Sequence, residues 1–281
     1  MDSLRPVRLS LKIFPLVLSM NKLSFKYLQV DTEERLKFLE RLLILGQLWF
    51  PSAIGFNDPN EFRCQLRAPK RKSIIRRQYF ADNSEAAEQD FESWYRTVSW
   101  KSWHVYQEPL IQRTLLSNLG VLCLSRTCRN PIMWAHYAGR HTGICVAFKV
   151  EFFAQIDNLI RCESVVYRKR LPRVKYFGED QTEVIKKILL TKYSGWAYEK
   201  EFRAITWEGD ITKQIAPSVI DGVILGMNVS KDKEEQVLRM IEKRQSPTKV
   251  FKAGLSYLTY EMDITNRFSH ELSESDISDY R

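Results

Sequence analysis

The 281-residue chain has a composition ordinary for a soluble globular protein, with 44% hydrophobic residues, 27% charged residues and a formal net charge of +9. No apolar run approaches the ~20 residues that a membrane span needs. Residues 5–20 are basic and then apolar, but Lys12 and Pro15 interrupt them and no small-residue cleavage site follows, which argues against a signal peptide. Five cysteines without paired spacing do not form a disulfide framework. These features predict a cytoplasmic, membrane-free protein with no metal.

The first part of the chain predicts an N-terminal extension, a strand and a helix. Residues 1–22 form the extension, and residues 23–30 alternate as a strand does. Asp31 and Glu34 have the spacing of a capping box, so a helix begins there, and Gly46 ends it. Its apolar face is predicted to comprise Leu36, Leu39, Leu42 and Leu43.

Residues 63–118 predict a helical lobe inserted into the main domain. Asp58 and Glu61, just before it, have capping-box spacing and predict a helix start, while Asn57 is a turn residue or a ligand-binding one. Residues 63–80 are predicted to be basic and mobile, and residues 84–117 to be helical. The aromatic residues at helical spacing would form a core or a base-stacking platform: Phe91, Trp94, Tyr95 and Trp103.

Residues 131–148 concentrate aromatic, histidine and glycine residues. Asn130 before Pro131 predicts an N-cap with proline at the first helical position, so residues 131–138 form about two turns. The apolar run 144–148 predicts a strand buried on both faces. The corner between this helix and strand is therefore the predicted place of a pocket.

Residues 196–207 predict a strand that carries two carboxylates. A period of two places Glu199, Glu201 and Arg203 on one face, with the carboxylates about 7 Å apart. The group is either a catalytic pair or a structural ion pair across a sheet. Further strands are predicted at 161–169, 219–225 and 248–264, helices at 179–191 and 231–244, and a polar, frayed tail over residues 266–281.

The basic residues gather in two clusters. The first contains seven cations and no acid: Arg63, Arg67, Lys70, Arg71, Lys72, Arg76 and Arg77. The second contains Arg168, Lys169, Arg170, Arg173 and Lys175. Such clusters suit a phosphate-rich partner such as nucleic acid, because each neutralised phosphate releases counterions, or they are solvated loops.

Several motifs in order resemble the bacterial domain of unknown function 2971 family. They are FKY (25–27), FNDPNEF (56–62), LCLSRTCRNPIMWAHYAGRHTGICVAF (122–148), WAYEKEFRAI (196–205) and VILG (223–226). The resemblance covers roughly residues 23–260. The chain departs from the family pattern at Asn60, where an aromatic residue is usual.

More distantly, the arrangement looks like the ADP-ribosyltransferase fold. This resemblance implies an α+β fold with split mixed or antiparallel sheets, and NAD as a substrate. It assigns Glu201 to the ribose and Glu199 to the acceptor as catalytic residues. Residues implied to line the dinucleotide site are Lys26, Tyr27, Asn57, Ser125, His136, Tyr137, His141 and Arg203.

Three functions follow as hypotheses. The first is an ADP-ribosyltransferase-like enzyme of bacterial toxin or phage-defence systems that modifies an anionic acceptor such as nucleic acid or hydrolyses the dinucleotide. The second is a non-catalytic nucleic-acid-binding module that works with a partner protein of a defence or toxin–antitoxin system. The third is a nuclease in which Asp58, Glu199 and Glu201 hold a metal.

Overall fold

The computed structural model describes residues 22–56, 58–67, 69–100, 116–175, 179–267 and 278–280 of an α+β protein. The described chain divides into two compact units. The sheet unit holds the described residues through Ser52, Leu119–Val165 and the chain from Trp196 onwards. The smaller unit holds the described parts of Ala53–Asn118 together with Val166–Gly195, so it differs from the predicted 63–118 insertion by including a second segment. The predicted α+β class is confirmed.

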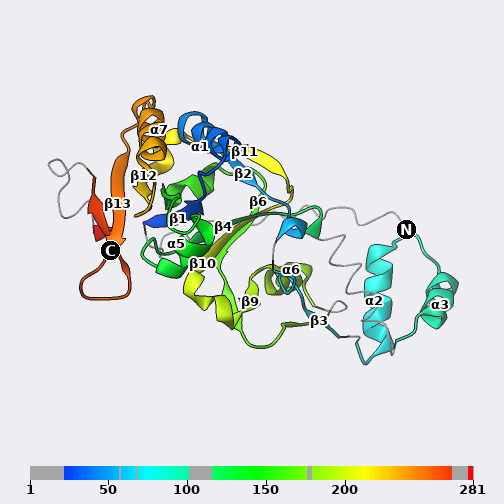
Figure 1. The fold of residues 1–281 in the computed structure, drawn as a ribbon. Coiled ribbons are helices and arrows are strands. Elements are labelled where there is room, and N and C mark those ends of the chain that lie inside the picture. Colours follow the sequence, from blue (N-terminus) through cyan, green and yellow to red (C-terminus); the bar gives the residue numbers. More distant parts are fainter. Residues whose placement is uncertain are drawn as a thin grey trace. The chain divides into compact units, whose positions relative to one another are not determined.

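The sheet unit is built on one mixed eight-stranded sheet in the order β14–β13–β12–β5–β1–β4–β10–β6 (Figure 1). Every neighbouring pair is antiparallel except β12 with β13, which is parallel. The strands are β1 (Leu23–Leu28), β4 (Gly120–Ser125), β5 (Ile144–Lys149), β6 (Leu159–Ser164), β10 (Glu201–Thr206), β12 (Ile220–Leu225), β13 (Lys249–Leu255) and β14 (Met262–Asn266). A separate pair joins β2 (Gln47–Phe50) to β11 (Ile211–Gln214).

Helices α1 (Glu33–Leu45) and α7 (Lys231–Glu242) contact each other and pack on the same core (Figure 1). The four predicted leucines of α1 are all buried, so its predicted apolar face is confirmed. The predicted N-cap was wrong by one residue. Thr32 caps the helix, because its hydroxyl accepts the Arg35 N–H at 3.3 Å, whereas the Asp31 carboxylate accepts from the Arg35 guanidinium at 2.6 Å. Gly46 ends α1 at φ +67°, as predicted.

A second core in this unit contains residues of α5 (Pro131–Tyr137) and every second residue of β1, namely Leu23, Phe25 and Tyr27. The fully buried Trp134 ring lies edge-on to Tyr27, with ring centroids 5.2 Å apart. The end of the described chain joins this core, which corrects the prediction of a frayed tail. Tyr280 is 2% exposed, stacks on Phe251 at 4.2 Å and donates its hydroxyl to Asp221 at 2.8 Å.

The smaller unit contains three helices and two short parallel strand pairs among its described residues. The helices are α2 (Lys72–Asp82), α3 (Glu88–Thr97) and α6 (Gln181–Leu189). One pair joins β3 (Gln65–Leu66) to β8 (Arg173–Val174), and the other joins β7 (Val166–Arg168) to β9 (Thr191–Tyr193). Four 3₁₀ helices complete the described elements of the two units: Ala53–Gly55, Val150–Gln155, Ser194–Glu199 and Pro217–Val219.

Several predicted elements of this region were wrong. Residues 63–80 are not a mobile loop, because α2 occupies much of them. Asp58 and Glu61 lie in a turn and start no helix: the Asp58 carboxylate accepts the Asn60 N–H at 2.8 Å, and Phe62 has φ +60°. The predicted strand 161–169 is broken at Val165 into β6 and β7, which pair with different strands.

The aromatic stripe of α3 packs as a small core. Phe91 is fully buried, and its ring lies 5.4 Å from Tyr79 of α2 and 5.6 Å from Tyr95. Trp94 stacks on Tyr79 at 4.9 Å. These contacts favour core packing over a base-stacking platform. The predicted helix over 84–117 is confirmed for residues 88–97, while Trp103, most of the N-terminal extension and residues 268–277 lie outside the described residues.

Candidate functional site

We call the junction of α5 and β5, with Trp134, His136 and Tyr137, the aromatic corner of the sheet unit. The cap of α5 fixes this corner. The Asn130 side chain accepts the N–H groups of Ile132 at 2.8 Å and Met133 at 3.3 Å, which confirms the predicted N-cap. Its amide also donates to the Tyr198 carbonyl at 3.1 Å. One side chain therefore holds both the start of α5 and the segment that precedes β10.

The connection from α5 to β5 is unusually tight. Gly139, Arg140 and His141 all have positive φ, between +56° and +68°. The Gly143 N–H donates to the Ala138 carbonyl at 2.7 Å, and a Cβ built on Gly143 would lie 2.2 Å from the Leu28 carbonyl oxygen. Only glycine fits at residue 143, because the backbones of β1 and the turn approach it so closely.

Glu199 and Glu201 do not share a strand, so the prediction that both lie on one face of a single strand was wrong. Glu199 is the last residue of the 3₁₀ helix Ser194–Glu199, and Lys200 follows at φ +45°. Glu201 begins β10. The positive φ between them changes the direction of the chain, and a period of two therefore does not apply across this boundary.

Glu199 connects the segment before β10 to the aromatic corner. It is 3% exposed, and its carboxylate accepts the Tyr137 hydroxyl at 2.6 Å. Its backbone carbonyl accepts the Ser125 hydroxyl at 2.7 Å. Burial, with the neighbouring Glu199 carboxylate, raises the pKa of Tyr137 well above its usual range, so the phenol stays protonated and acts as the donor.

Glu201 forms a buried ion pair with Arg203. The Arg203 Nε lies 2.7 Å and one terminal nitrogen 3.0 Å from the two carboxylate oxygens. Glu201 is 4% exposed and Arg203 is fully buried. A two-point contact of this kind fixes the orientation of both side chains.

Strand β4 pairs with β1 on one side and with β10 on the other, which aligns Ser125 with a residue of each strand. Phe25, Ser125 and Glu201 are register partners across β1, β4 and β10. Lys26 of β1 is half-buried. Burial lowers the pKa of Lys26, and the charges of Cys123 and Glu201 act in the opposite direction. Lys26 therefore lies within electrostatic reach of the Glu201 carboxylate.

Tyr27 and His141 were both predicted to line the dinucleotide site, and burial shifts the pKa of each. The Tyr27 hydroxyl donates to the Thr127 carbonyl at 2.9 Å, and its ring lies in the α5 core. Burial raises the pKa of Tyr27 well above its usual range. Burial also lowers the pKa of His141, whose Nδ1 has no hydrogen-bond partner among the described residues. Asn57 lies outside the described residues.

His136 is the exposed part of the corner. Its Nδ1 lies 3.1 Å from the Tyr198 hydroxyl, and its ring centroid lies 6.4 Å from that of Trp196. Sequence reasoning did not include Trp196 and Tyr198 in the site. The sequence signal for these two residues is WAY (196–198), directly before Glu199. These residues were predicted to begin a strand, but they lie in the 3₁₀ helix Ser194–Glu199.

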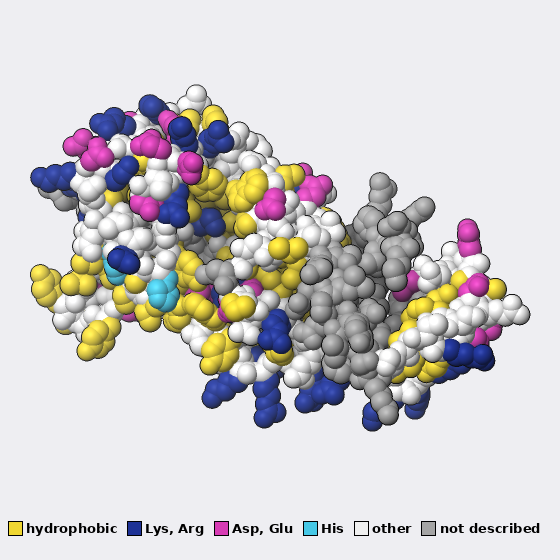
Figure 2. Space-filling model, turned by 45° about the vertical axis from the view of Figure 1, so that its right-hand side comes forward, with side chains coloured by type: hydrophobic (Ala, Val, Ile, Leu, Met, Phe, Trp, Pro, Cys, Tyr) yellow, Lys and Arg dark blue, Asp and Glu magenta, His cyan; other side chains and the backbone are white. Residues whose placement is uncertain are grey.

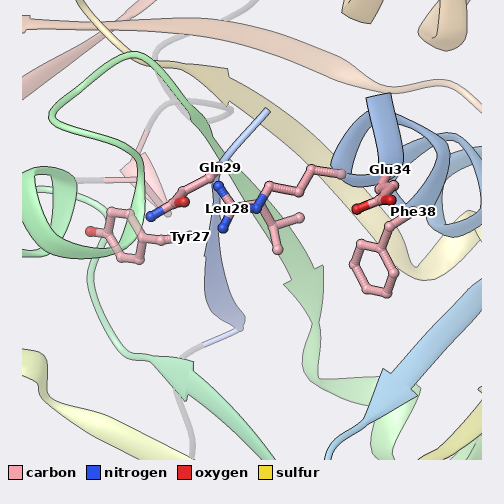
Figure 3. Close-up of a pocket in the computed structure, with 6 residues that line it drawn as sticks. Tyr27, Leu28, Gln29, Glu34 and Phe38 are labelled. Atoms are coloured by element: carbon pink, nitrogen blue, oxygen red, sulfur yellow. The ribbon is translucent and has the colours of Figure 1, made fainter. Parts of the chain in front are cut away.

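A surface pocket of about 320 Å³ lies between the end of β1 and the start of α1. Figure 3 shows Glu34 and Phe38 on the α1 side of this pocket and Tyr27, Leu28 and Gln29 on the β1 side. Tyr27 is the one predicted site residue that lines it. This pocket is therefore distinct from the Glu199–Tyr137 contact.

The predicted nucleic-acid residues, all in the smaller unit, divide into two groups. Lys72 pairs with Glu92 at 2.6 Å and Arg76 pairs with Glu88, so α3 carboxylates neutralise both. The remaining five are exposed: Arg63, Arg67, Lys70, Arg71 and Arg77. Arg63 donates to the Asn60 side chain at 3.1 Å.

Within the described part of the chain, no three or more His, Cys, Asp or Glu side chains are grouped as metal ligands would be. None of its helices combines the length and apolarity that crossing a bilayer requires.

Comparison with known proteins gives one match. Residues 133–204 match the family model described as "Protein of unknown function (DUF2971)". No curated protein and no solved structure matches the chain, so the resemblance to ADP-ribosyltransferases stays a prediction. The matched segment includes most of α5, β5, both glutamates and Arg203. The match supports the predicted relation of the chain to the DUF2971 family over that segment.

Proposed function

We propose that the chain is an ADP-ribosyltransferase-like enzyme that cleaves the nicotinamide–ribose bond of a nicotinamide dinucleotide. One observation carries the proposal. The buried carboxylate of Glu199 accepts the Tyr137 hydroxyl at 2.6 Å, next along the chain to the buried Glu201–Arg203 pair. Two carboxylates and an aromatic corner, far apart in the sequence, therefore meet in one part of the sheet unit.

The chemistry needs fixed negative charge beside a sugar. As the bond breaks, nicotinamide leaves with the bonding electrons and the ribose C1′ becomes positively charged. An oxygen of the acceptor, or of water, then forms the new bond to C1′ and gives up its proton. Carboxylates that are already oriented stabilise such a charge without reorganising. The buried Glu201, oriented by Arg203, suits this role.

Glu199 suits the acceptor side of the reaction. Its carboxylate is oriented by the Tyr137 hydroxyl. The exposed ring of His136 contacts the half-buried rings of Tyr137 and Tyr198, which lie on α5 and on the 3₁₀ helix that ends at Glu199. Aromatic faces can stack on a nicotinamide ring. Lys26, which is half-buried on β1, is the amine that we assign to the dinucleotide phosphates. The role of such an enzyme in bacterial defence or toxin systems rests on the resemblance alone.

The test measures nicotinamide release by chromatography. The purified chain is incubated with the dinucleotide alone and with DNA, RNA or protein acceptors. We expect release from the wild type and a loss of about 100-fold or more in Glu199→Gln and Glu201→Gln. Glu261→Gln, which changes an exposed carboxylate, is the matched control and should keep full activity. The proposal fails if the folded wild type releases no nicotinamide with any acceptor.

A second candidate is nucleic-acid binding without catalysis. The exposed cations of the smaller unit favour it. It predicts salt-dependent binding that Glu199→Gln and Glu201→Gln leave unchanged, together with no dinucleotide consumption.

A further inference from the structure

Two basic segments that are distant in the sequence meet in the smaller unit. The parallel pairing of β3 with β8 places Gln65 opposite Arg173 and Leu66 opposite Val174. The pairing continues past β3, because the Arg67 N–H donates to the Val174 carbonyl at 2.9 Å. The first basic cluster of the sequence is thereby joined to the second.

The cations of this strand pair lie on its exposed side. Leu66 is 5% exposed and Val174 is fully buried, whereas Arg67, Arg173 and Lys175 are exposed. Alternate residues of a strand point to opposite faces, so the apolar pair faces inward and the cations face solvent.

The second strand pair has the same alternation. Tyr167 and Lys192 are partners on one side, and the Lys192 ammonium lies 3.6 Å from the buried Glu61 carboxylate. Arg168 and Tyr193 are partners on the other side, and both are exposed. The Tyr193 side chain is 57% exposed and its ring lies against Gly195, where a built Cβ would be 2.5 Å from the ring.

Residues 169–172 connect the two strand pairs and add two exposed cations, Lys169 and Arg170. We define the basic strip as Arg67, Arg168, Lys169, Arg170, Arg173 and Lys175. No salt bridge to any of these six side chains is found among the described residues. The nearby Glu179 carboxylate accepts the Lys175 backbone N–H and is paired with Lys187. Figure 2 shows Lys and Arg side chains gathered along the lower edge of the view.

We infer that the basic strip, with Tyr193, binds a single-stranded nucleic acid. Six exposed cations, none of them in a salt bridge with another described residue, attract a phosphate backbone and release its counterions. An exposed aromatic ring beside such a row can stack on an unpaired base, which a duplex does not offer. The inference does not depend on the proposed dinucleotide chemistry, and it names a binding surface that excludes Lys72 and Arg76.

The test uses fluorescence anisotropy with a labelled 20-nucleotide single strand and the matching duplex, at two salt concentrations. The double variant Arg67→Gln/Arg173→Gln removes one cation directly after β3 and one from β8. We expect about tenfold weaker binding at low salt and a salt slope lower by about 1.4, or 0.7 for each lost phosphate contact. The matched control is Lys72→Gln/Arg76→Gln, which removes the same formal charge from α2 and should change affinity less than about twofold.

Tyr193→Ala tests the preference for a single strand. We expect about tenfold weaker binding to the single strand with an unchanged salt slope and no change for the duplex, while Tyr193→Phe keeps the affinity. The inference is overturned if the folded protein binds no strand, if the control pair weakens binding as much as the strip pair, or if Tyr193→Ala has no effect. Glu199→Gln should bind normally, which separates this result from the dinucleotide assay.

Discussion

The hydrogen bond between Tyr137 and Glu199 is the contact on which the site depends at the scale of single residues. Tyr137→Phe removes the donor and leaves a buried carboxylate oxygen without it. We expect the free energy of unfolding to fall by about 1–3 kcal/mol. Tyr198→Phe, which removes a hydroxyl facing the exposed His136, should cost less. Urea unfolding of the two variants measures the difference, and equal losses would contradict this account of the site.

His141 gives the protein a pH-dependent contribution to stability. Burial lowers its pKa in the folded state below the ordinary value of about 6.5. As the pH falls, His141 therefore binds a proton at a higher pH in the unfolded chain than in the folded one. Neutral His141 contributes fully to the free energy of unfolding above about pH 6.5, and this contribution is lost as the pH falls through the folded pKa. His141→Asn, which tolerates the φ of +68°, should remove this loss.

Unfolding free energies of wild type and His141→Asn at pH 7.5 and pH 5 check this prediction. The wild type should lose more stability than the variant between the two pH values. A difference between the proteins that stays constant with pH would show that His141 does not titrate with unfolding.

At the scale of elements, the turn between α5 and β5 depends on a close backbone approach. Gly143→Ala would place a Cβ 2.2 Å from the Leu28 carbonyl oxygen, and backbone cannot yield as a flexible side chain can. We expect a loss of about 1–3 kcal/mol or more. Gly254→Ala in β13 is the matched control, because nothing lies within 4 Å of its built Cβ. Thermal unfolding of both variants should show a lower midpoint for Gly143→Ala alone.

The elements themselves were predicted unevenly, for a physical reason. The cap and length of α5, the apolar face of α1 and the buried β5 were predicted correctly, because each depends on residues close in sequence. The strand over 196–207 was predicted too long, since the 3₁₀ helix and the positive φ of Lys200 leave no clear periodic signal. That boundary places Glu199 in the 3₁₀ helix and Glu201 in β10.

At the scale of the whole molecule, the last described residues complete the α5 core. Tyr280→Ala should lower the free energy of unfolding by about 3–5 kcal/mol, because it empties space between Phe25 and Phe251. Its ring also covers Gly222, whose built Cβ would lie 2.4 Å from the hydroxyl. Tyr257→Ala, at a fully exposed tyrosine, should change stability by less than about 0.5 kcal/mol. Equal effects would show that Tyr280 is not docked in solution.

The sequence by itself determined the α+β class, the capped aromatic helix and the presence of two late glutamates beside an arginine. Tertiary structure alone decided which partner each carboxylate meets, that Arg67 lies beside β8, and that Tyr280 packs on Phe251. Local patterns record hydrogen bonds and amphipathic faces within a few residues. Contacts between distant residues depend on how the intervening chain closes, and no short pattern records that.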